Sequence, residues 1–522
     1  MTRLHLTKPL LRLLETYKAV SFAVGGGLLA AVANNWAEGF FAWAGAMCGV
    51  AGLWLALWRS ANRWQTRAAV AWMWFFAYFS LALGFFFAAT AADWLPLTPA
   101  GRWGTAALAW GMTIVVLSLG AGVWALVPLV HRARGAWWGV ALAGVAFAAV
   151  EAARAWTFGL LTWASEVGAG AIGTLAMPAY LIIEHPWGFI PARAGEVWAL
   201  AAVLGIGGWA LARAALHWRE IYKWVLGRQR YLSGASSAAV LVLFFLLVSA
   251  LVPTGLFGVG GNEPNARVAA VSFGATQRIS AQEYETNKLS VLVAQALQGA
   301  AAEGVDFVVL PENIPFVPFL RGYGWVAEVA KQLPASAVVI ASQTQETGGE
   351  PDRRAVVAAA FTARGEEIAR REKAALVPIG EYLPLLFAFA AKSAGFSREV
   401  SYFLEHFRHT PASKAESLAV GRAPIGVVLC SEAFAPRVVR DASVGALWVA
   451  NPSSPSWFRG SPMYARIYER TIRTRAAALG KPVAVSQIEG PALLIDSAGA
   501  VRVRARAKKE EVRVVVFGNR EP

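Results

Sequence analysis

Long apolar runs fill the first half of the chain, and short polar segments separate them. A membrane-spanning helix needs about 20 consecutive, mostly apolar residues. Runs of this kind cover residues 19–34, 38–58, 69–90, 104–130, 137–157, 195–216 and 235–257. The first is short and follows a basic start that resembles a signal peptide, but no small-residue cleavage site stands out, so we expect it to be retained. The pattern predicts an α-helical transmembrane domain of about seven spans over residues 1–257.

The segments between the apolar runs alternate in charge. Lys and Arg are concentrated at residues 59–67, 131–135 and 217–230, whereas residues 34–38, 91–101 and 166–171 carry few or none. Short loops rich in Lys and Arg stay in the cytoplasm. We therefore expect the N-terminus and the basic loops to be cytoplasmic. Seven crossings would then place everything after residue 258 on the outer side.

The pattern changes after a turn-rich linker, GVGGNEPNA, at residues 258–266. Short β-branched runs follow, among them RVAAVSF, VDFVVLPE, SAVVIASQ and IGVVLCSE, and amphipathic helical stretches alternate with some of them. Alternation of strands and helices is typical of α/β folds. The length is sufficient for a full hydrophobic core. Residues 267–522 are thus predicted to form one α/β domain.

Composition agrees with a membrane protein. The chain is 57% hydrophobic with a mean hydropathy of +0.46, and its 16% of charged residues is well below the roughly 25% of soluble domains. The net charge of +15 could suggest nucleic acid, but much of the basic charge lies between the apolar runs, where membrane topology accounts for it. The sequence shows no zinc spacing, RNA-binding motif or Walker loop. We expect no nucleic-acid partner and no metal.

Candidate chemistry lies at the ends of predicted strands in the second half, where α/β folds gather active sites. The polar residues at these ends are Glu312, Lys373, Glu381, Tyr382, Cys430 and Glu432. Taken singly, each has an ordinary structural explanation. Cys430 could be a small buried hydrophobe, Glu312 a helix cap, and Lys373 part of a solvated charged stretch. Of the two cysteines, Cys48 lies in an apolar run of the first half, so we expect no disulfide.

Together these residues form a chemical set. A thiolate attacks carbonyl groups. A carboxylate in a dry pocket can act as general base, because burial raises its pKa. A nearby ammonium can stabilise the thiolate and the oxyanion of the tetrahedral intermediate. The chain order Glu312, Lys373, Cys430 is the order of a nitrilase-type triad.

Several motifs, in the right order after such a membrane region, resemble the apolipoprotein N-acyltransferases, the membrane-bound branch of the carbon–nitrogen hydrolases in the nitrilase superfamily. They are PEN (311–313), EKAALVPIGEYLP (372–384), CSE (430–432) and the arginine-rich segment with its following strands (470–501), together with EAARAWTFGLLTW (151–163), which is similar to a periplasmic arm. The likeness covers almost the whole chain. It implies that the second domain is a nitrilase-like α-β-β-α sandwich.

The resemblance implies roles for individual residues. Cys430 would be the nucleophile, Glu312 the base, and Lys373 the group that stabilises thiolate and oxyanion. Glu381 and Glu432 match acidic positions that position or tune the triad, although a structural salt bridge would explain them as well. Tyr382 continues the lysine motif as a supporting residue.

Aromatic residues match further family positions. Trp457 and Phe458 correspond to a loop near the acyl channel, with membrane-interface anchoring as the alternative. Trp163 corresponds to an arm tryptophan, for which packing against a neighbouring span is the alternative.

The implied activity is transfer of a fatty acyl chain from a phospholipid, through a cysteine thioester, to the α-amine of a diacylglyceryl-cysteine lipoprotein. No cofactor is implied. The implied location is the bacterial inner membrane, with the catalytic domain on the periplasmic side.

The chain also departs from the family pattern. Ser431 replaces a tyrosine, Ser454 and Pro455 replace Asn and Asp in the 451–458 loop, the arm reads GLLTW, and the family's last span has no counterpart. Two alternatives therefore stay open. One is a membrane-bound amidase, or an N-acyltransferase paralogue such as those linked to conjugation, that acts on another acceptor. The other is a non-catalytic membrane docking protein.

Overall fold

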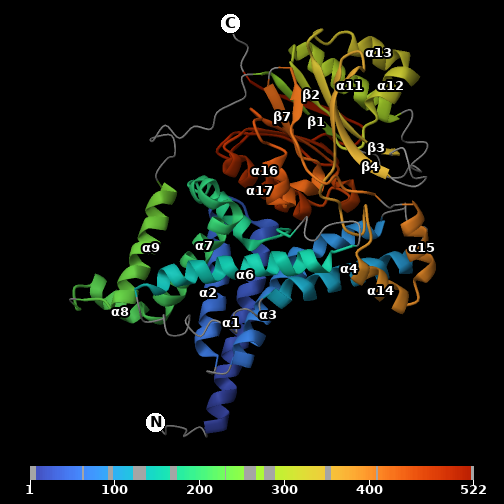
Figure 1. The fold of residues 1–522 in the computed structure, drawn as a ribbon. Coiled ribbons are helices and arrows are strands. Elements are labelled where there is room, and N and C mark those ends of the chain that lie inside the picture. The colour runs from blue at the N-terminus through green and yellow to red at the C-terminus, as the bar shows by residue number, and fades with distance from the viewer. Residues whose placement is uncertain are drawn as a thin grey trace. The chain divides into compact units, whose positions relative to one another are not determined.

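The computed structural model describes most of the chain (Figure 1). The described residues are 8–60, 64–91, 98–120, 137–164, 173–229, 231–251, 266–274, 288–346, 354–406, 409–421 and 423–518. The chain divides into two compact units. The helical unit comprises Met1–Gly84, Trp110–Phe158 and Ala176–Gly258, and the sandwich unit comprises Phe85–Ala109, Gly159–Leu175 and Val259–Pro522. Two short segments of the first half thus group with the second half. The predicted linker lies almost entirely outside the described residues.

The first half is helical. Its elements are α1 (Lys8–Trp36), α2 (Gly39–Arg59), α3 (Trp64–Ala82), η1 (Gly84–Ala91), α4 (Pro99–Leu119), α6 (Gly139–Leu161), η4 (Pro178–Glu184), α7 (Phe189–Leu216), α8 (Trp218–Val225) and α9 (Gly234–Leu251). Within the described residues, six helices are long and apolar enough to cross a membrane. The seventh expected span is the shorter apolar helix α9, and residues 252–257 lie outside the described part. These helices identify the chain as a membrane protein.

Glycines allow the helices of the helical unit to approach closely. A Cβ added to Gly26 of α1 would lie 2.6 Å from the carbonyl oxygen of Gly49 in α2. The indole nitrogen of Trp74 in α3 donates a hydrogen bond to the same oxygen over 2.8 Å. In lipid, the hydrophobic effect does not drive helices together, so close packing at small residues stabilises such crossings.

The sandwich unit is built on two connected groups of strands. One runs β5 (Glu367–Glu372), β4 (Arg354–Thr362), β3 (Val338–Glu346), β2 (Phe307–Val309), β1 (Val268–Phe273) and β12 (Val512–Phe517). The other runs β6 (Leu418–Val420), β7 (Ala423–Val427), β8 (Val449–Ser453), β9 (Val483–Ile488), β10 (Ala492–Ile495) and β11 (Val501–Ala505). They join where the ends of β1 and β9 pair, at Ser272 with Gln487 and Phe273 with Ile488. Ser486 bridges this junction, because its hydroxyl accepts from Val271 N–H and donates to the Val309 carbonyl.

Strand residues alternate between two hydrophobic cores. Val268 and Ala270 of β1 belong to a core shared by both groups of strands, which includes Ile425 of β7. Ala269 and Val271 point the other way, into a core shared with α11 (Lys288–Glu303). Because successive side chains of a strand point to opposite faces, a strand buried on both faces must be mostly apolar, as β1 is apart from Ser272.

Helices form the outer layers. On the first group of strands, the core includes residues of α11, α12 (Phe316–Gly322) and α13 (Gly324–Ala330). On the other side lie α16 (Pro436–Asp441) and α17 (Pro462–Leu479), and the Arg473 side chain of α17 donates to the Gly499 carbonyl between β10 and β11. The remaining elements are α14 (Leu385–Ser393), α15 (Ser397–His406), η6 (Cys430–Phe434) and η7 (Pro455–Phe458). The expected fold class, apolar helices followed by an α-β-β-α sandwich, is confirmed.

Candidate active site

Four strands deliver polar residues to one edge of the sandwich. β2 is parallel to β3, and β5 has the same direction because two antiparallel pairings separate it from β3. β7 and β8 are parallel to each other, and β8 continues in parallel through β9 and β1 to β2. The carboxyl ends of all four strands therefore share an edge. Glu312, Lys373, Cys430 and Ser454 each follow one of them.

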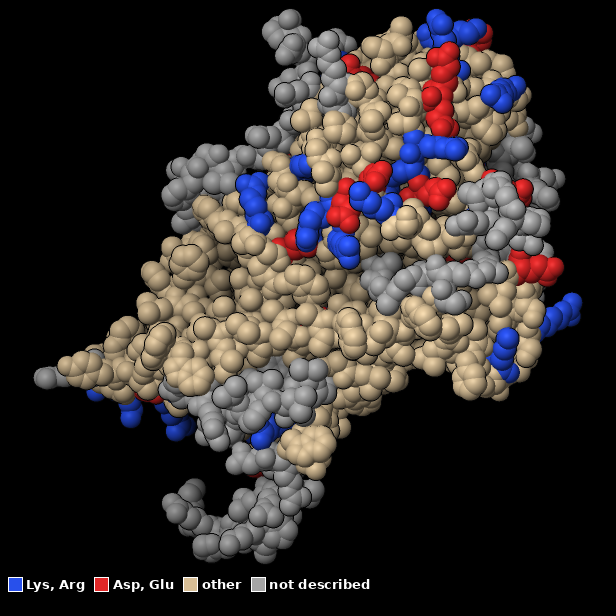
Figure 2. Space-filling view, viewed as in Figure 1, with Lys and Arg blue, Asp and Glu red and all other residues tan. Residues whose placement is uncertain are grey.

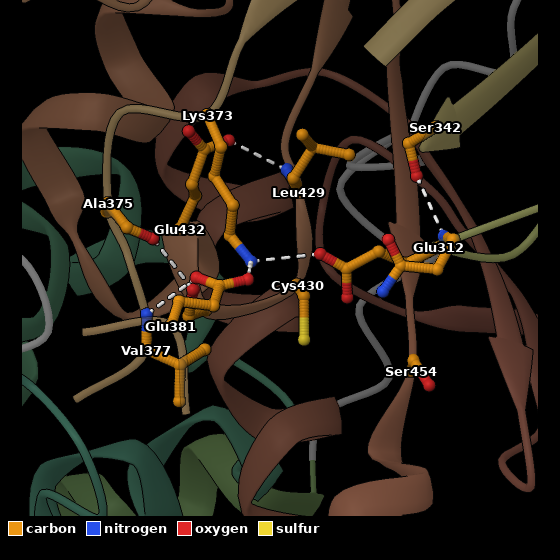
Figure 3. A network of polar contacts seen from close by, with 12 residues as sticks. Glu312, Ser342, Lys373, Ala375, Val377, Glu381, Leu429, Cys430, Glu432 and Ser454 are labelled. Atoms are coloured by element: carbon orange, nitrogen blue, oxygen red, sulfur yellow. Dashed lines mark hydrogen bonds and ion pairs between the residues drawn. The ribbon is translucent and has the colours of Figure 1, made fainter. Parts of the chain in front are cut away.

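Lys373 lies between two carboxylates. Its Nζ is 2.9 Å from Glu312 Oε1 and 2.7 Å from Glu381 Oε1 (Figure 3). The second oxygen of Glu381 accepts from the Val377 backbone N–H over 2.8 Å, which fixes the orientation of that carboxylate. Lys373 and Glu312 are both about 98–99% buried. The ammonium is therefore held by ion pairs that solvent does not screen.

Cys430 lies beside this ion-paired group, at the start of η6. Its thiol donates a hydrogen bond to the Glu312 carboxylate, and the Ser454 backbone N–H donates to its sulfur. Figure 3 shows the Glu312 and Lys373 side chains beside the Cys430 side chain, with Ser454 below Glu312. The backbone of Cys430 has φ +37°, a value that is costly for a residue with a side chain. The strained turn presents the sulfur to the carboxylate.

Burial sets the resting protonation state. Burial raises the pKa of the Cys430 thiol, the Glu312 charge raises it further, and Lys373 only partly offsets both. Burial also raises the pKa of the Glu312 carboxyl above its ordinary value, with Lys373 opposing. For Lys373, burial disfavours the ammonium, but the charges of Glu312 and Glu381 outweigh burial and raise its pKa. The resting site thus holds a thiol and an ammonium.

Glu432 ties the lysine strand to the cysteine turn. Its two oxygens accept from Ala374 N–H over 2.7 Å and from Leu429 N–H over 2.8 Å. Arg371 forms a buried ion pair with the same carboxylate. The Ser431 hydroxyl adds a bond of 2.8 Å to the Ala375 carbonyl. These contacts join the segments that carry Lys373 and Cys430.

Tyr382 connects the site to the segment 159–164, which contains Trp163. The Tyr382 hydroxyl donates to the Thr162 carbonyl over 2.7 Å, and the Leu385 N–H donates to the Trp163 carbonyl over 3.1 Å. Ala164 and Tyr382 also share a small buried apolar cluster. Trp163 itself is 46% exposed. Its described contact with Leu385 is made through the Trp163 backbone.

An aromatic cluster adjoins the cysteine turn. Phe458 lies 4.5 Å from the Tyr464 ring and 4.8 Å from the Phe85 ring, measured between centroids. Tyr464 continues to Tyr468 and Phe434. The Trp457 side chain lies outside the described residues. Phe458 therefore belongs to an aromatic cluster that reaches the turn carrying Cys430 through Tyr464 and Tyr468.

Asn451 and Tyr468 were not among the residues predicted from the sequence. The Tyr468 hydroxyl lies 3.2 Å from the Cys430 carbonyl oxygen and 2.9 Å from Asn451 Oδ1, and the Asn451 amide donates to the Val428 carbonyl over 2.6 Å. This chain of bonds clamps the strained turn from the side of α17. An asparagine within the apolar run of β8 was the one available sign, since a buried amide needs partners.

No metal cluster is seen in the part of the chain that the structure describes, because no three His, Cys, Asp or Glu side chains are grouped to hold an ion.

Comparisons with known proteins agree with the motifs. No family model matches the chain. The chain is 25% identical over 339 residues to an apolipoprotein N-acyltransferase from Geobacter metallireducens, a match that covers 62% of this chain and 62% of that relative. It is also 25% identical over 417 residues to an apolipoprotein N-acyltransferase from Rhizobium meliloti, covering 76% of this chain and 72% of that relative. The match thus spans less than two thirds of the Geobacter protein.

Among solved structures, an amidase of the nitrilase superfamily from Nesterenkonia matches at a TM-score of 0.33 and 16% identity, over 50% of this chain and 92% of that one. A carbon–nitrogen hydrolase from Helicobacter pylori matches at a TM-score of 0.34 and 16% identity, over 49% and 89%. By its sequence relatives, the chain is a distant homologue of the apolipoprotein N-acyltransferases.

Proposed function

We propose that the protein transfers a fatty acyl chain from a phospholipid, through a thioester on Cys430, to the α-amine of a diacylglyceryl-cysteine lipoprotein. The observation that carries the proposal is the buried grouping of Cys430, Glu312 and Lys373, in which Lys373 Nζ lies 2.9 Å from the Glu312 carboxylate beside the thiol. Nucleophile, base and cation are the groups that acyl transfer needs. The lipid substrates are those of the homologous family, and they suit a chain with several candidate membrane spans.

The first half-reaction would form the acyl-enzyme. Cys430 Sγ attacks the ester carbonyl carbon of the phospholipid, and its proton passes to Glu312. Lys373 stabilises the negative oxygen of the tetrahedral intermediate. The intermediate collapses by breaking the bond to the glycerol oxygen, which takes the proton from Glu312 and leaves as the lysophospholipid. Glu312 returns to its carboxylate form.

The second half-reaction would reverse these roles. The neutral α-amine attacks the thioester carbonyl and gives a proton to Glu312. The carbon–sulfur bond breaks, an amide forms, and the leaving sulfur recovers the proton from Glu312. Because the same carboxylate accepts and returns a proton in each half, one site serves two substrates in turn.

The apolar surroundings fit a lipid substrate. Phe85, Phe458 and Tyr464 form a continuous aromatic cluster next to the cysteine turn. Such a wall would favour an acyl chain over a small polar amide. We also propose the topology expected from the basic loops, with the sandwich unit on the outer side of the inner membrane.

The acceptor is tested by mass spectrometry of a synthetic peptide. The purified protein in phospholipid vesicles is mixed with a diacylglyceryl-cysteine peptide whose α-amine is free. A matched peptide carries an acetylated α-amine. We expect one added fatty acyl group on the free peptide, none on the acetylated peptide, and none with Cys430→Ala. An acyl-enzyme that forms while the free peptide stays unmodified would refute the proposed acceptor.

A different acceptor is the second candidate, and one observation favours it. Ser454, which stands where the family has Asn, donates its backbone N–H to the sulfur of Cys430. Pro455 follows it, so the departure from the family pattern lies at the reacting atom. An amidase, or a paralogue with another amine acceptor, would keep the triad and change this loop. A panel of amines and amides offered to the acyl-enzyme would distinguish the two functions.

A further inference from the structure

Helix α8 starts where a candidate span ends. α7 ends at Leu216 and α8 begins at Trp218, with His217 between them at φ −114° and ψ 22°. These dihedrals are not helical, so the chain turns at His217. α7 has the length of a candidate membrane span, and α8 follows it directly in the chain.

The two faces of α8 differ in character. At 100° per residue, Trp218, Tyr222 and Val225 share one side, whereas Arg219 and Lys223 share the other. The apolar side is uncovered: Trp218 is 55% exposed, Tyr222 54% and Val225 67%. No residue of the helix is buried. A helix with this composition would be unstable in water without a partner for its apolar side.

Glu220, the one acidic residue of α8, fixes the helix to the beginning of α9. Glu220 Oε1 accepts from the Ser233 N–H over 2.8 Å, at the start of α9, and Oε2 contacts the Ser236 hydroxyl over 3.4 Å. Glu220 also pairs with His217 over 3.2 Å. α8 is thus fixed to the beginning of α9, and its apolar side stays open even though its orientation is set.

Exposed basic side chains lie beside the apolar side of α8. Arg219, Lys223 and Arg228 are exposed, and the segment 217–230 holds four Lys and Arg residues against one Glu. Figure 2 shows Lys and Arg side chains gathered below a surface of uncharged residues at the place where Figure 1 draws α8. With four basic residues against one carboxylate, the segment that contains α8 carries a net positive charge.

We propose that α8 is a binding surface for anionic phospholipids. Its apolar side lies among the acyl chains of the membrane interface, and Arg219 and Lys223 contact the negative headgroups. Amphipathic helices with aromatic and basic sides bind membrane surfaces in this way. The surface is separate from the Cys430 site and does not depend on the proposed acyl transfer.

The depth of the helix provides the first test. A fluorophore is attached at Tyr222→Cys or Val225→Cys on the apolar side, and at Lys223→Cys on the polar side, in the full chain with Cys48→Ser and Cys430→Ala, reconstituted in vesicles. We expect lipids brominated in their acyl chains to quench the probes at 222 and 225, and aqueous iodide to quench the probe at 223. Equal iodide quenching at all three positions would overturn the proposal.

Headgroup selectivity provides the second test. The probe at 222 is quenched with brominated phosphatidylglycerol or brominated phosphatidylcholine. We expect stronger quenching by phosphatidylglycerol, and the preference should fall about fivefold for each charge removed in Arg219→Gln with Lys223→Gln. The control variant, Lys331→Gln with Arg437→Gln, removes two exposed charges from the sandwich unit and should keep the preference. No preference in the unaltered chain, or one that survives loss of Arg219 and Lys223, would contradict the proposal.

Discussion

Lys373 Nζ lies 2.9 Å from Glu312 Oε1, and both groups are withdrawn from solvent. Glu381 lies on the other side of the same ammonium, 2.7 Å away. One positive charge therefore faces two carboxylates. A resting thiolate on Cys430 would add a further negative charge to this group. In the proposed mechanism, the proton of Cys430 therefore leaves as the sulfur attacks, and Glu312 is the base that accepts it.

Glu312→Gln should abolish formation of the acyl-enzyme while the fold is kept. Glutamine preserves the size and a hydrogen bond but cannot accept the thiol proton. General base catalysis is worth about 10²–10⁴-fold in rate, so acyl transfer should fall by at least that factor. The check is the rate of acyl-enzyme formation, with circular dichroism to confirm folding. Substantial residual turnover in a folded variant would remove Glu312 from the mechanism.

The pH dependence should follow Glu312. Burial raises the pKa of its carboxyl above the ordinary value, and only the carboxylate form accepts a proton. Acyl-enzyme formation should therefore fall as pH decreases through that raised pKa. The rate of acylation, measured against pH, should have its acid limb above the ordinary range for glutamate. A rate that stays constant into that acid range would show that another group is the base.

Lys373→Met should destabilise the protein in a pH-dependent way. Removing the ammonium leaves Glu312 and Glu381 buried and uncompensated, which costs about 3–5 kcal/mol of unfolding free energy when both are ionised. Protonation of Glu312, whose pKa burial raises, removes this repulsion at lower pH. The difference in Tm between variant and unaltered chain should therefore shrink as pH falls. Lys331→Met, at an exposed ion pair, is the control and should change Tm little at any pH.

Arg371→Met should loosen the connection between the lysine strand and the cysteine turn. The change leaves the fully buried Glu432 carboxylate without its cation, and breaking a buried pair costs about 3–5 kcal/mol. Arg371→Met with Glu432→Gln should recover part of this loss, because no uncompensated charge remains. Denaturant unfolding of the single and double variants measures the coupling. Additive effects would show that the pair does not act as a unit.

Tyr468→Phe should slow the chemistry of Cys430 through the backbone. The variant loses the hydroxyl 3.2 Å from the Cys430 carbonyl, a hydrogen bond worth about 1 kcal/mol, so alkylation of the thiol should slow about fivefold. The neighbouring Tyr464→Phe is the matched control, and it keeps the clamp on the turn. Iodoacetamide labelling across pH reads thiol reactivity without any acyl substrate. Equal labelling rates in both variants would argue against the clamp.

The sequence made the edge of the sandwich predictable. Glu312 and Cys430 each follow a β-branched run, and parallel strands end at the same edge, so their approach could be expected. Lys373 was harder to place, since RREK also suits a solvated surface. The structure buries it because β5 ends beside β4 within the sandwich.

Contacts between residues that are far apart in the sequence could not be predicted in the same way. Tyr468 has the spacing of an ordinary core residue of α17, and only the three-dimensional packing brings it to the Cys430 carbonyl. Arg371 alternates along β5 among other charged residues, and its pairing with Glu432 depends on β5 meeting the η6 turn. The grouping of residues 85–109 and 159–175 with the second half could not be predicted for the same reason. Hydropathy indicates that a segment is buried, but not which segment it packs against.

The central claim is the thioester on Cys430, and intact-protein mass spectrometry after incubation with phospholipid vesicles tests it most directly. We predict a mass increment of one fatty acyl group on the unaltered chain, mapped to the peptide containing Cys430, removed by hydroxylamine and absent from Cys430→Ala. An unmodified chain under the same conditions, or an increment that persists in Cys430→Ala, would contradict the account.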